Sequence, residues 1–336
     1  MKNSIEKKAS YPTLFSGRFL LQASLFRERS FSRFPVSGFL NLIIAVFLSA
    51  FVFTSCEDVI DVKLSGETLN LYGVEASITT VDQPTVFLYK TLRVNQDEAY
   101  PGVSGAVVTI SDNATPVNTI TLTEDPSKKG YYKVPQNASY PGVTGREYTL
   151  TIQTDGVTLV AKDHLYKVEP IDSIRVEPSL RGDKRFFGVF VYGKEPAGLG
   201  NYYKWDVYVN DKLIHEADRI SCASDEFVDG NYISKLEIFT DYYEYNKEDK
   251  DRKIKLNNVV QVKQNSISKF AYDFYSQMIN QSSSGGLFSV PVANIKSNFK
   301  GSDNKPVLGL FVARDVSVSN PVLINQKLED QLDKRP

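Results

Sequence analysis

Short segments of alternating apolar and polar residues recur along residues 69–166. Ala106, Val108 and Ile110 share one face of such a segment, and the opposite face is largely polar. Asp155-Gly156 separates two further alternating runs, which is a strong local signal for a β-hairpin. The pattern predicts seven strands, at residues 69–78, 84–93, 105–111, 118–123, 130–134, 146–153 and 157–163.

After residue 170 the alternation continues in longer segments. It predicts strands at residues 173–177, 185–192, 201–209, 232–243, 253–264 and 307–313. One segment has a different period, because apolar residues recur at steps of three and four from Ile267 to Met278. We therefore predict an amphipathic helix over residues 267–281, with Ser266 as its N-cap. The charged residues from Gln326 onward are expected to form a frayed end.

The first set of strands, from SGAVVTISD through YYKV to REYTLTI, resembles the prealbumin-like sandwich domains that are appended to many exported proteins. We expect an all-β protein whose N-terminal domain, residues 69–168, is a prealbumin- or Ig-like β-sandwich. A second, mainly antiparallel β domain with one short amphipathic helix is expected at residues 169–322. Residues 323–336 are expected to form a charged C-terminal tail.

The N-terminal segment has the composition of an export signal. A basic stretch precedes an apolar run at residues 39–53, which is shorter than the roughly 20 residues that a spanning helix needs. The run ends in Phe53-Thr54-Ser55-Cys56, which resembles the lipobox of bacterial lipoproteins, although Phe53 replaces the usual Leu or Val. The interpretation is a lipoprotein signal peptide at 1–55, acylated Cys56 and a tether at 56–68. An uncleaved N-terminal anchor with an incidental cysteine is the alternative.

Composition and charge narrow the class of protein. The 42% hydrophobic fraction is typical of a globular chain and excludes a disordered tail or a multi-span membrane protein. Residues 1–56 carry seven Lys/Arg and two Asp/Glu, which leaves 32 basic and 38 acidic residues, a net charge of −6, in 57–336. No basic stripe for nucleic acid is present. With Cys56 lipidated and Cys222 alone, no disulfide is expected.

Several segments in a fixed order resemble one family. They are the Cys56 motif and residues 68–78, 103–110 (VSGAVVTI), 145–152 (GREYTLTI), 170–174 (PIDSI), 201–205 (NYYKW), 225–230 (DEFVDG) and 307–311 (VLGLF). Their order is similar to that of the domain of unknown function 4249 family of Bacteroidota outer-membrane lipoproteins. That family has no assigned activity. The resemblance implies an accessory role beside TonB-dependent outer-membrane receptors, and acidic residues just after Cys56 look like a surface-export signal.

Residues with catalytic potential are few. The chain has two histidines, His164 and His215, and neither belongs to a nucleophile motif. Cys222 has no histidine near it in sequence and is interpreted as an inert thiol. HExxH, GxSxG and P-loop patterns do not occur. We therefore predict that the protein is not an enzyme and has no cofactor.

Two segments are candidate binding sites. Residues 225–230 cluster three carboxylates near a glycine, but the spacing is not that of an EF-hand, so a solvated turn is favoured over a calcium site and no metal is predicted. Tyr242, Tyr243 and Tyr245 adjoin a charged loop and are the candidates for binding a carbohydrate or peptide ligand, since tyrosine has an apolar body and a polar tip. Sheet-face tyrosines are the alternative.

The combined expectation is a lipid-anchored outer-membrane protein that faces the cell exterior. It would contact the membrane through acylated Cys56 and act with a TonB-dependent receptor in nutrient capture or receptor assembly. An adhesin or structural cell-surface module is the second hypothesis, and a hydrolase of unfamiliar type is the third.

Overall fold

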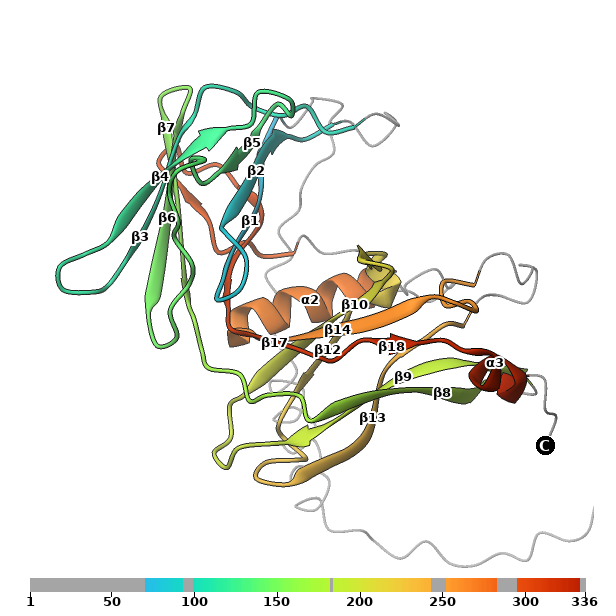
Figure 1. The fold of residues 1–336 in the computed structure, drawn as a ribbon. Coiled ribbons are helices and arrows are strands. Elements are labelled where there is room, and N and C mark those ends of the chain that lie inside the picture. Colours follow the sequence, from blue (N-terminus) through green and yellow to red (C-terminus); the bar gives the residue numbers. More distant parts are fainter. Residues whose placement is uncertain (1–69, 93–98, 182–183, 243–251, 283–294, 333–336) are drawn as a thin grey trace, which may run out of the picture. The chain divides into compact units, whose positions relative to one another are not determined.

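A computed structural model describes residues 70–92, 99–181, 184–242, 252–282 and 295–332 (Figure 1). The protein is all-β, as predicted. All seven strands expected in the first half are present, with ends within a few residues of those predicted. They are β1 (Tyr72–Thr79), β2 (Thr85–Lys90), β3 (Val107–Asp112), β4 (Thr119–Glu124), β5 (Tyr131–Lys133), β6 (Glu147–Thr154) and β7 (Val157–His164).

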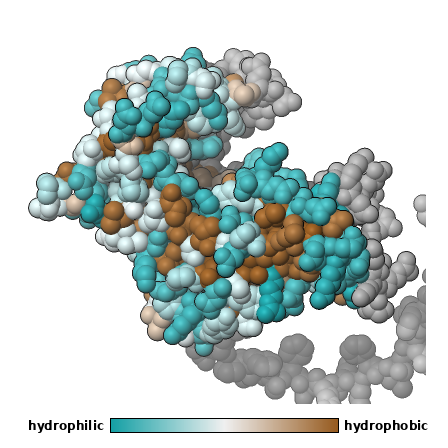
Figure 2. All heavy atoms as spheres, viewed as in Figure 1, coloured by the Kyte–Doolittle hydropathy of each residue, from teal (hydrophilic) through white to brown (hydrophobic). Residues whose placement is uncertain are grey.

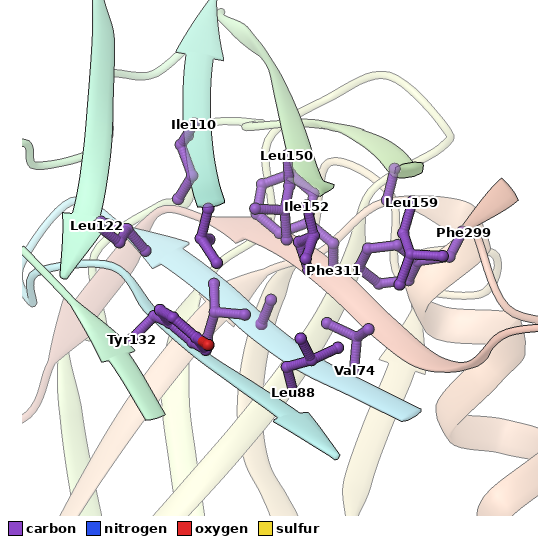
Figure 3. Packing of buried hydrophobic residues seen from close by; sticks show 14 of the residues in the cluster. Val74, Leu88, Ile110, Leu122, Tyr132, Leu150, Ile152, Leu159, Phe299 and Phe311 are labelled. Carbon is purple, nitrogen blue, oxygen red and sulfur yellow. The ribbon is translucent and has the colours of Figure 1, made fainter. Parts of the chain in front are cut away.

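These strands belong to one nine-stranded sheet that folds over itself. The strand order is β15-β7-β6-β3-β4-β5-β2-β1-β16, where β15 is Lys300–Gly301 and β16 is Leu308–Arg314. Strand β4 pairs with both β3 and β5, so it joins the two halves of the sheet. Val74 and Leu88 from one half point toward Ile110 and Leu150 from the other, and all four side chains are fully buried (Figure 3).

Strand β16 joins this sheet from far along the chain. Residues 307–313 were predicted as a strand, but within the range expected for the second domain; in the structure β16 instead pairs in parallel with β1, Val74 lying opposite Gly309. Gly309 has φ +96°, and a Cβ atom there would lie 2.0 Å from the carbonyl oxygen of Val74. Only glycine allows this close backbone approach. Phe299, Phe311 and Ala313 complete the buried core.

Side chains bridge the two ends of the folded sheet, between β7, which is next to the edge strand β15, and the opposite edge strand β16. Asn298 donates to the carbonyl oxygens of Lys162 (3.2 Å) and Phe311 (2.8 Å), and it accepts a hydrogen bond from the Phe311 N–H (3.0 Å). The carboxylate of Asp163 accepts one from the Ala313 N–H at 2.8 Å. The backbone N–H and C=O groups of Phe311 and the N–H of Ala313, which a free edge strand would expose, are therefore hydrogen-bonded. This removes a site where another strand could pair.

The remaining strands form two smaller sheets around a second core. A six-stranded sheet has the path β11-β10-β14-β17 with β12 on β10 and β18 on β14, and a three-stranded sheet has the order β13-β9-β8. The bounds are β8 (Ser173–Arg181), β9 (Lys184–Lys194), β10 (Tyr202–Val209), β11 (Lys212–Leu213), β12 (Ser221–Ser224), β13 (Tyr232–Thr240), β14 (Val259–Ser266), β17 (Val316–Val318) and β18 (Val322–Leu323). Val318 and Leu323 leave apolar surface along β17 and β18 (Figure 2).

Three local predictions are corrected here. The strand expected at residues 253–264 begins only at Val259, because Ile254 leaves the strand path to fill the second core. The charged end contains a helix, α3 (Gln326–Leu332), since Leu328 and Leu332 pack on that core. The helix expected at 267–281 is confirmed as α2 (Lys269–Ser282), but Ser268 caps it, through a 3.2 Å hydrogen bond from the Ala271 N–H.

Asp315 stands at the corner between β16 and β17. Its carboxylate accepts hydrogen bonds from the Thr80 hydroxyl (2.7 Å) and from the Val168 N–H (2.9 Å). The Ser266 hydroxyl accepts a hydrogen bond from the Asp315 N–H at 3.2 Å and donates one to the carbonyl oxygen of Tyr166. Because it makes these two bonds, Ser266 does not cap α2. The end of β1, the connection at 166–168 and the end of β14 thus meet at one residue.

The buried carboxyl group of Asp163 should make the free energy of unfolding depend on pH. It is 8% exposed, and burial raises the pKa of its carboxyl to about 6 against hydrogen bonds that lower it. In the unfolded chain the pKa is 3.8, so protonation favours the folded state. That contribution is complete below pH 3.8 and is lost as the pH rises through about 6.

Asp163→Asn keeps an acceptor for the Ala313 N–H and removes the titration. Between pH 4 and pH 7, the free energy of unfolding of wild type should fall relative to that of the variant by about 2–3 kcal/mol. Urea unfolding of residues 57–336 across this range measures it. Parallel pH profiles for the two proteins would refute this assignment.

Candidate binding site

Tyr242 is the one of the three candidate tyrosines that lies in the described part of the chain; Tyr243 and Tyr245 lie outside it. It follows β13, its side chain is 43% exposed, and its ring packs edge-on against Phe186 with the centroids 5.2 Å apart. Its carbonyl oxygen accepts a hydrogen bond from Arg219, which also donates to the Thr240 carbonyl at 2.8 Å. The ring therefore has one apolar contact and one exposed side.

Asp241 fixes the position of this segment. Its carboxylate is 2% exposed and accepts the backbone N–H groups of Lys253 and Ile254, both at 2.9 Å. Its own N–H donates to the carbonyl of Phe187. Burial raises the pKa of Asp241, although the two backbone donors act against this. The chain before residue 243 and the chain after residue 251 are thus held side by side.

A cavity of about 430 Å³ lies next to this junction. Tyr242 does not line it. The lining residues come from the β10–β11 hairpin, the segment before η2 (Ala217–Arg219) and the connection that leads into β14; they are Val209, Asn210, Lys212, Leu213, Ile214, His215, Glu216, Arg252, Lys253, Lys255 and Asn258. Four of these are Lys or Arg and one is Glu, although the chain carries more acidic than basic residues after Cys56.

Two of the cations in this cavity are neutralised by ion pairs. Arg252 makes a two-pronged contact with Glu329 of α3, with N–O distances of 2.7 and 3.1 Å, and Lys253 pairs with Glu216 at 2.5 Å. Lys212 is exposed and has no ion-pair partner among the described residues. The cavity can therefore accept an anionic group such as a carboxylate, and its charge acts through Lys212 most directly.

The two histidines lie in different parts of the fold, His164 on β7 and His215 in the segment after β11. His164 ends β7 and its ring packs on that of Tyr166, with a centroid distance of 4.5 Å. His215 lines the cavity, with Nδ1 3.3 Å from the carbonyl oxygen of Leu213. Its neighbour Glu216 has a pKa lowered by the hydrogen bond from Lys253, which makes it a weak base.

Cys222 and residues 225–230 serve the structure. The thiol of Cys222 lies on β12, 3.8 Å from the Ser276 hydroxyl of α2, and burial raises its pKa, so it stays protonated. The expected turn is present, since the Asp225 carbonyl accepts the Val228 N–H at 2.9 Å, but the Asp225 carboxylate is buried and accepts the N–H groups of Gly200 and Asn201, both at 2.9 Å. Within the described ranges, no group of three or more His, Cys, Asp or Glu side chains is placed to hold a metal ion.

The prediction from sequence missed the cavity. Asn210 and Asp211 both have positive φ, the geometry of a tight two-residue hairpin, and this Asn-Asp pair was the local signal that would have placed Lys212 back against β10. The other lysines are contributed by the connection at residues 252–258, more than 35 residues further along the chain. No sequence periodicity brings those two segments together.

The chain belongs to the domain of unknown function (DUF4249) family, whose model matches residues 57–319. This confirms the resemblance drawn from the order of the sequence segments. No curated protein matches the chain. Among the described residues, no helix has the length and apolar character that crossing a membrane requires. Cys56 and the apolar run at 39–53 lie outside those residues.

Proposed function

We propose that this member of the DUF4249 family is a lipid-anchored binding protein of the outer membrane that faces the cell exterior. It acts with a TonB-dependent receptor in nutrient capture or receptor assembly, and it does not turn over substrate. The observation that carries the proposal is the apolar run at residues 39–53 followed directly by Thr54-Ser55-Cys56. Several acyl chains on one cysteine would anchor the protein far more firmly than a single chain.

The roles of the reactive side chains favour binding over catalysis. Cys222 is kept protonated by burial, Glu216 is held ionised by Lys253, and Asp225 caps two backbone N–H groups. A catalytic site needs a nucleophile and a base within hydrogen-bonding distance of each other. His164 lies on β7 and His215 in the segment after β11, and the two rings have separate aromatic and backbone contacts. These arrangements support a scaffold that presents surfaces.

The ligand proposed for the cavity is an acidic oligosaccharide or an acidic peptide. Lys212 and Lys255 are exposed around it, and carboxylate groups would be attracted to them. Tyr242 is exposed and does not line the cavity, but its neighbour Asp241 accepts the N–H of Lys253, which does. Charge on the ligand distinguishes this proposal from one in which tyrosine stacking alone selects a neutral sugar.

Cys56→Ser tests the anchor. The variant should leave the membrane fraction and stop incorporating labelled palmitate, because the thiol that takes the lipid is gone. Cys222→Ser is the matched control, since it removes the other cysteine and should change neither property. A Cys56→Ser protein that stays in the membrane fraction and still incorporates palmitate would end the lipoprotein interpretation.

Affinity purification of the tagged wild-type chain from solubilised outer membranes tests the role. A large β-barrel receptor should be recovered with it, and mass spectrometry identifies that receptor. Recovery of an anchored protein with no receptor would favour an adhesin or structural module instead. In that case, deletion should impair cell attachment without loss of nutrient uptake.

Lys212→Glu tests the ligand. Titration calorimetry with oligogalacturonate should show affinity reduced roughly three- to ten-fold, because the substitution replaces attraction with repulsion at one exposed cation. Lys129→Glu makes the same charge change on an exposed lysine between β4 and β5 and should leave affinity unchanged. Equal affinities for both variants, or equal binding of a neutral maltooligosaccharide, would exclude the acidic oligosaccharide.

A further inference from the structure

Two neighbouring loops hold the two most exposed large hydrophobic side chains in the described part of the molecule. Leu199 is 70% exposed and lies between β9 and β10; Phe227 is 90% exposed and lies between β12 and β13. We refer to residues 195–201 and 225–231 together as the loop pair. Single exposed apolar residues are ordinary on protein surfaces. Leu199 and Phe227 therefore indicate a contact surface only if the two loops hold them together.

Hydrogen bonds join the two loops into one unit. The buried carboxylate of Asp225 accepts the N–H groups of Gly200 and Asn201, both at 2.9 Å, and Asp229 accepts that of Gly198 at 2.6 Å. Gly198 and Gly200 have φ of +120° and +115°, a conformation that L side chains rarely adopt. Leu199, which lies between these glycines, is therefore held in a defined position opposite residues 225–229.

A second layer of contacts fixes the base of the loop pair. Glu195 is 2% exposed, and its carboxylate accepts hydrogen bonds from the Tyr203 hydroxyl (2.9 Å) and the Asn201 amide (3.0 Å). Its N–H donates to the carbonyl of Asn231 at 2.9 Å. Burying two carboxylates costs free energy that these hydrogen bonds offset. The loop pair thus displays its apolar side chains from a rigid base, which lowers the entropy lost on binding.

The charge of the loop pair indicates what it contacts. Of its four carboxylates, Glu195 and Asp225 are buried, whereas Glu226 is exposed and Asp229 partly exposed, and the loop pair contains no Lys or Arg. Apolar tips that insert into membranes are typically accompanied by basic residues, which attract anionic headgroups. Acidic residues around Phe227 instead complement a protein surface that carries cations, and interfaces place aromatic side chains in apolar pockets inside a polar rim.

We propose that the loop pair docks onto the receptor protein, with Phe227 and Leu199 entering an apolar pocket bordered by Lys or Arg side chains. This proposal rests on the proposed function, because it assigns the contact surface for the same partner. A fixed aromatic side chain in a desolvated pocket is the kind of residue that dominates binding energy at interfaces.

Co-purification with the full lipidated chain tests the proposal. The double variant Phe227→Ala/Leu199→Ala should recover at least ten-fold less receptor than wild type. Val117→Ala/Val143→Ala is the control, because these side chains are 60% and 41% exposed on loops of the nine-stranded sheet; it should recover as much as wild type. Thermal unfolding should be the same for all three proteins, since truncating an exposed side chain changes stability little.

Glu226→Lys gives a second measurement that leaves both apolar side chains in place. It should lower receptor recovery as well, through repulsion from the cationic rim. If the double variant or Glu226→Lys recovers as much receptor as wild type, the docking surface is wrong and the proposed function stands. If wild type recovers no receptor, the proposed function fails and the docking surface falls with it. Phe227-dependent flotation of the Cys56→Ser chain with phospholipid vesicles would identify a membrane as the occupant and overturn the proposal.

Discussion

The carboxylate of Asp315 joins the nine-stranded sheet to the six-stranded sheet, and the rest of the structure depends on this junction. It lies where the chain passes from β16, in the nine-stranded sheet, to β17, in the six-stranded sheet. Thr80 at the end of β1 and Val168 in the connection between the two sets of strands both donate to it. One side chain therefore holds together the chain at Thr80, at Val168 and at Asp315, which are far apart in sequence. This fixes where the two sheets meet.

Strand β16 contributes side chains to two hydrophobic clusters, one on each of its faces. Phe311 and Ala313 are buried in the core of the nine-stranded sheet, whereas Leu310 and Val312 pack against Ile267 and Ala271 at the start of α2. Arg314, the last residue of β16, pairs with Asp206 on β10 at 3.2 Å, and Lys204 contacts the same carboxylate. The pKa of Asp206 is lowered by these two cations against the effect of burial. Such buried charges are tolerated only because they are paired.

Local patterns in the sequence were sufficient for most of the strands and for α2, because period-2 and period-3.6 alternation report which face of an element is buried. They could not predict the partner of β16, because pairing with β1 depends on the space left by the β1–β2 edge and on Gly309. The cap of α2 was misplaced by two residues for a similar reason. Ser266 is engaged by Asp315 and Tyr166, and neither contact is local.

The functional surfaces show the same division. Turn residues correctly indicated a turn at 225–230, but the sequence does not reveal that Phe227 projects from it or that Leu199 lies on the loop bonded to it. Likewise, the placement of the basic residues at 252–255 around a cavity with Lys212 depends on the pairing of β10 with β14. The pairing of strands in the tertiary structure decides which side chains are exposed and which charges lie together at each surface. Local sequence patterns do not contain this information.

The central claim is that the loop pair of this protein binds a receptor in the outer membrane. Photo-crosslinking in intact cells tests it most directly, with a benzophenone amino acid placed at position 227 of the lipidated chain and, for comparison, at position 117. We expect position 227 to crosslink to one β-barrel outer-membrane protein and position 117 to give no such product. A crosslink to lipid from position 227, or the same products from both positions, would contradict the account.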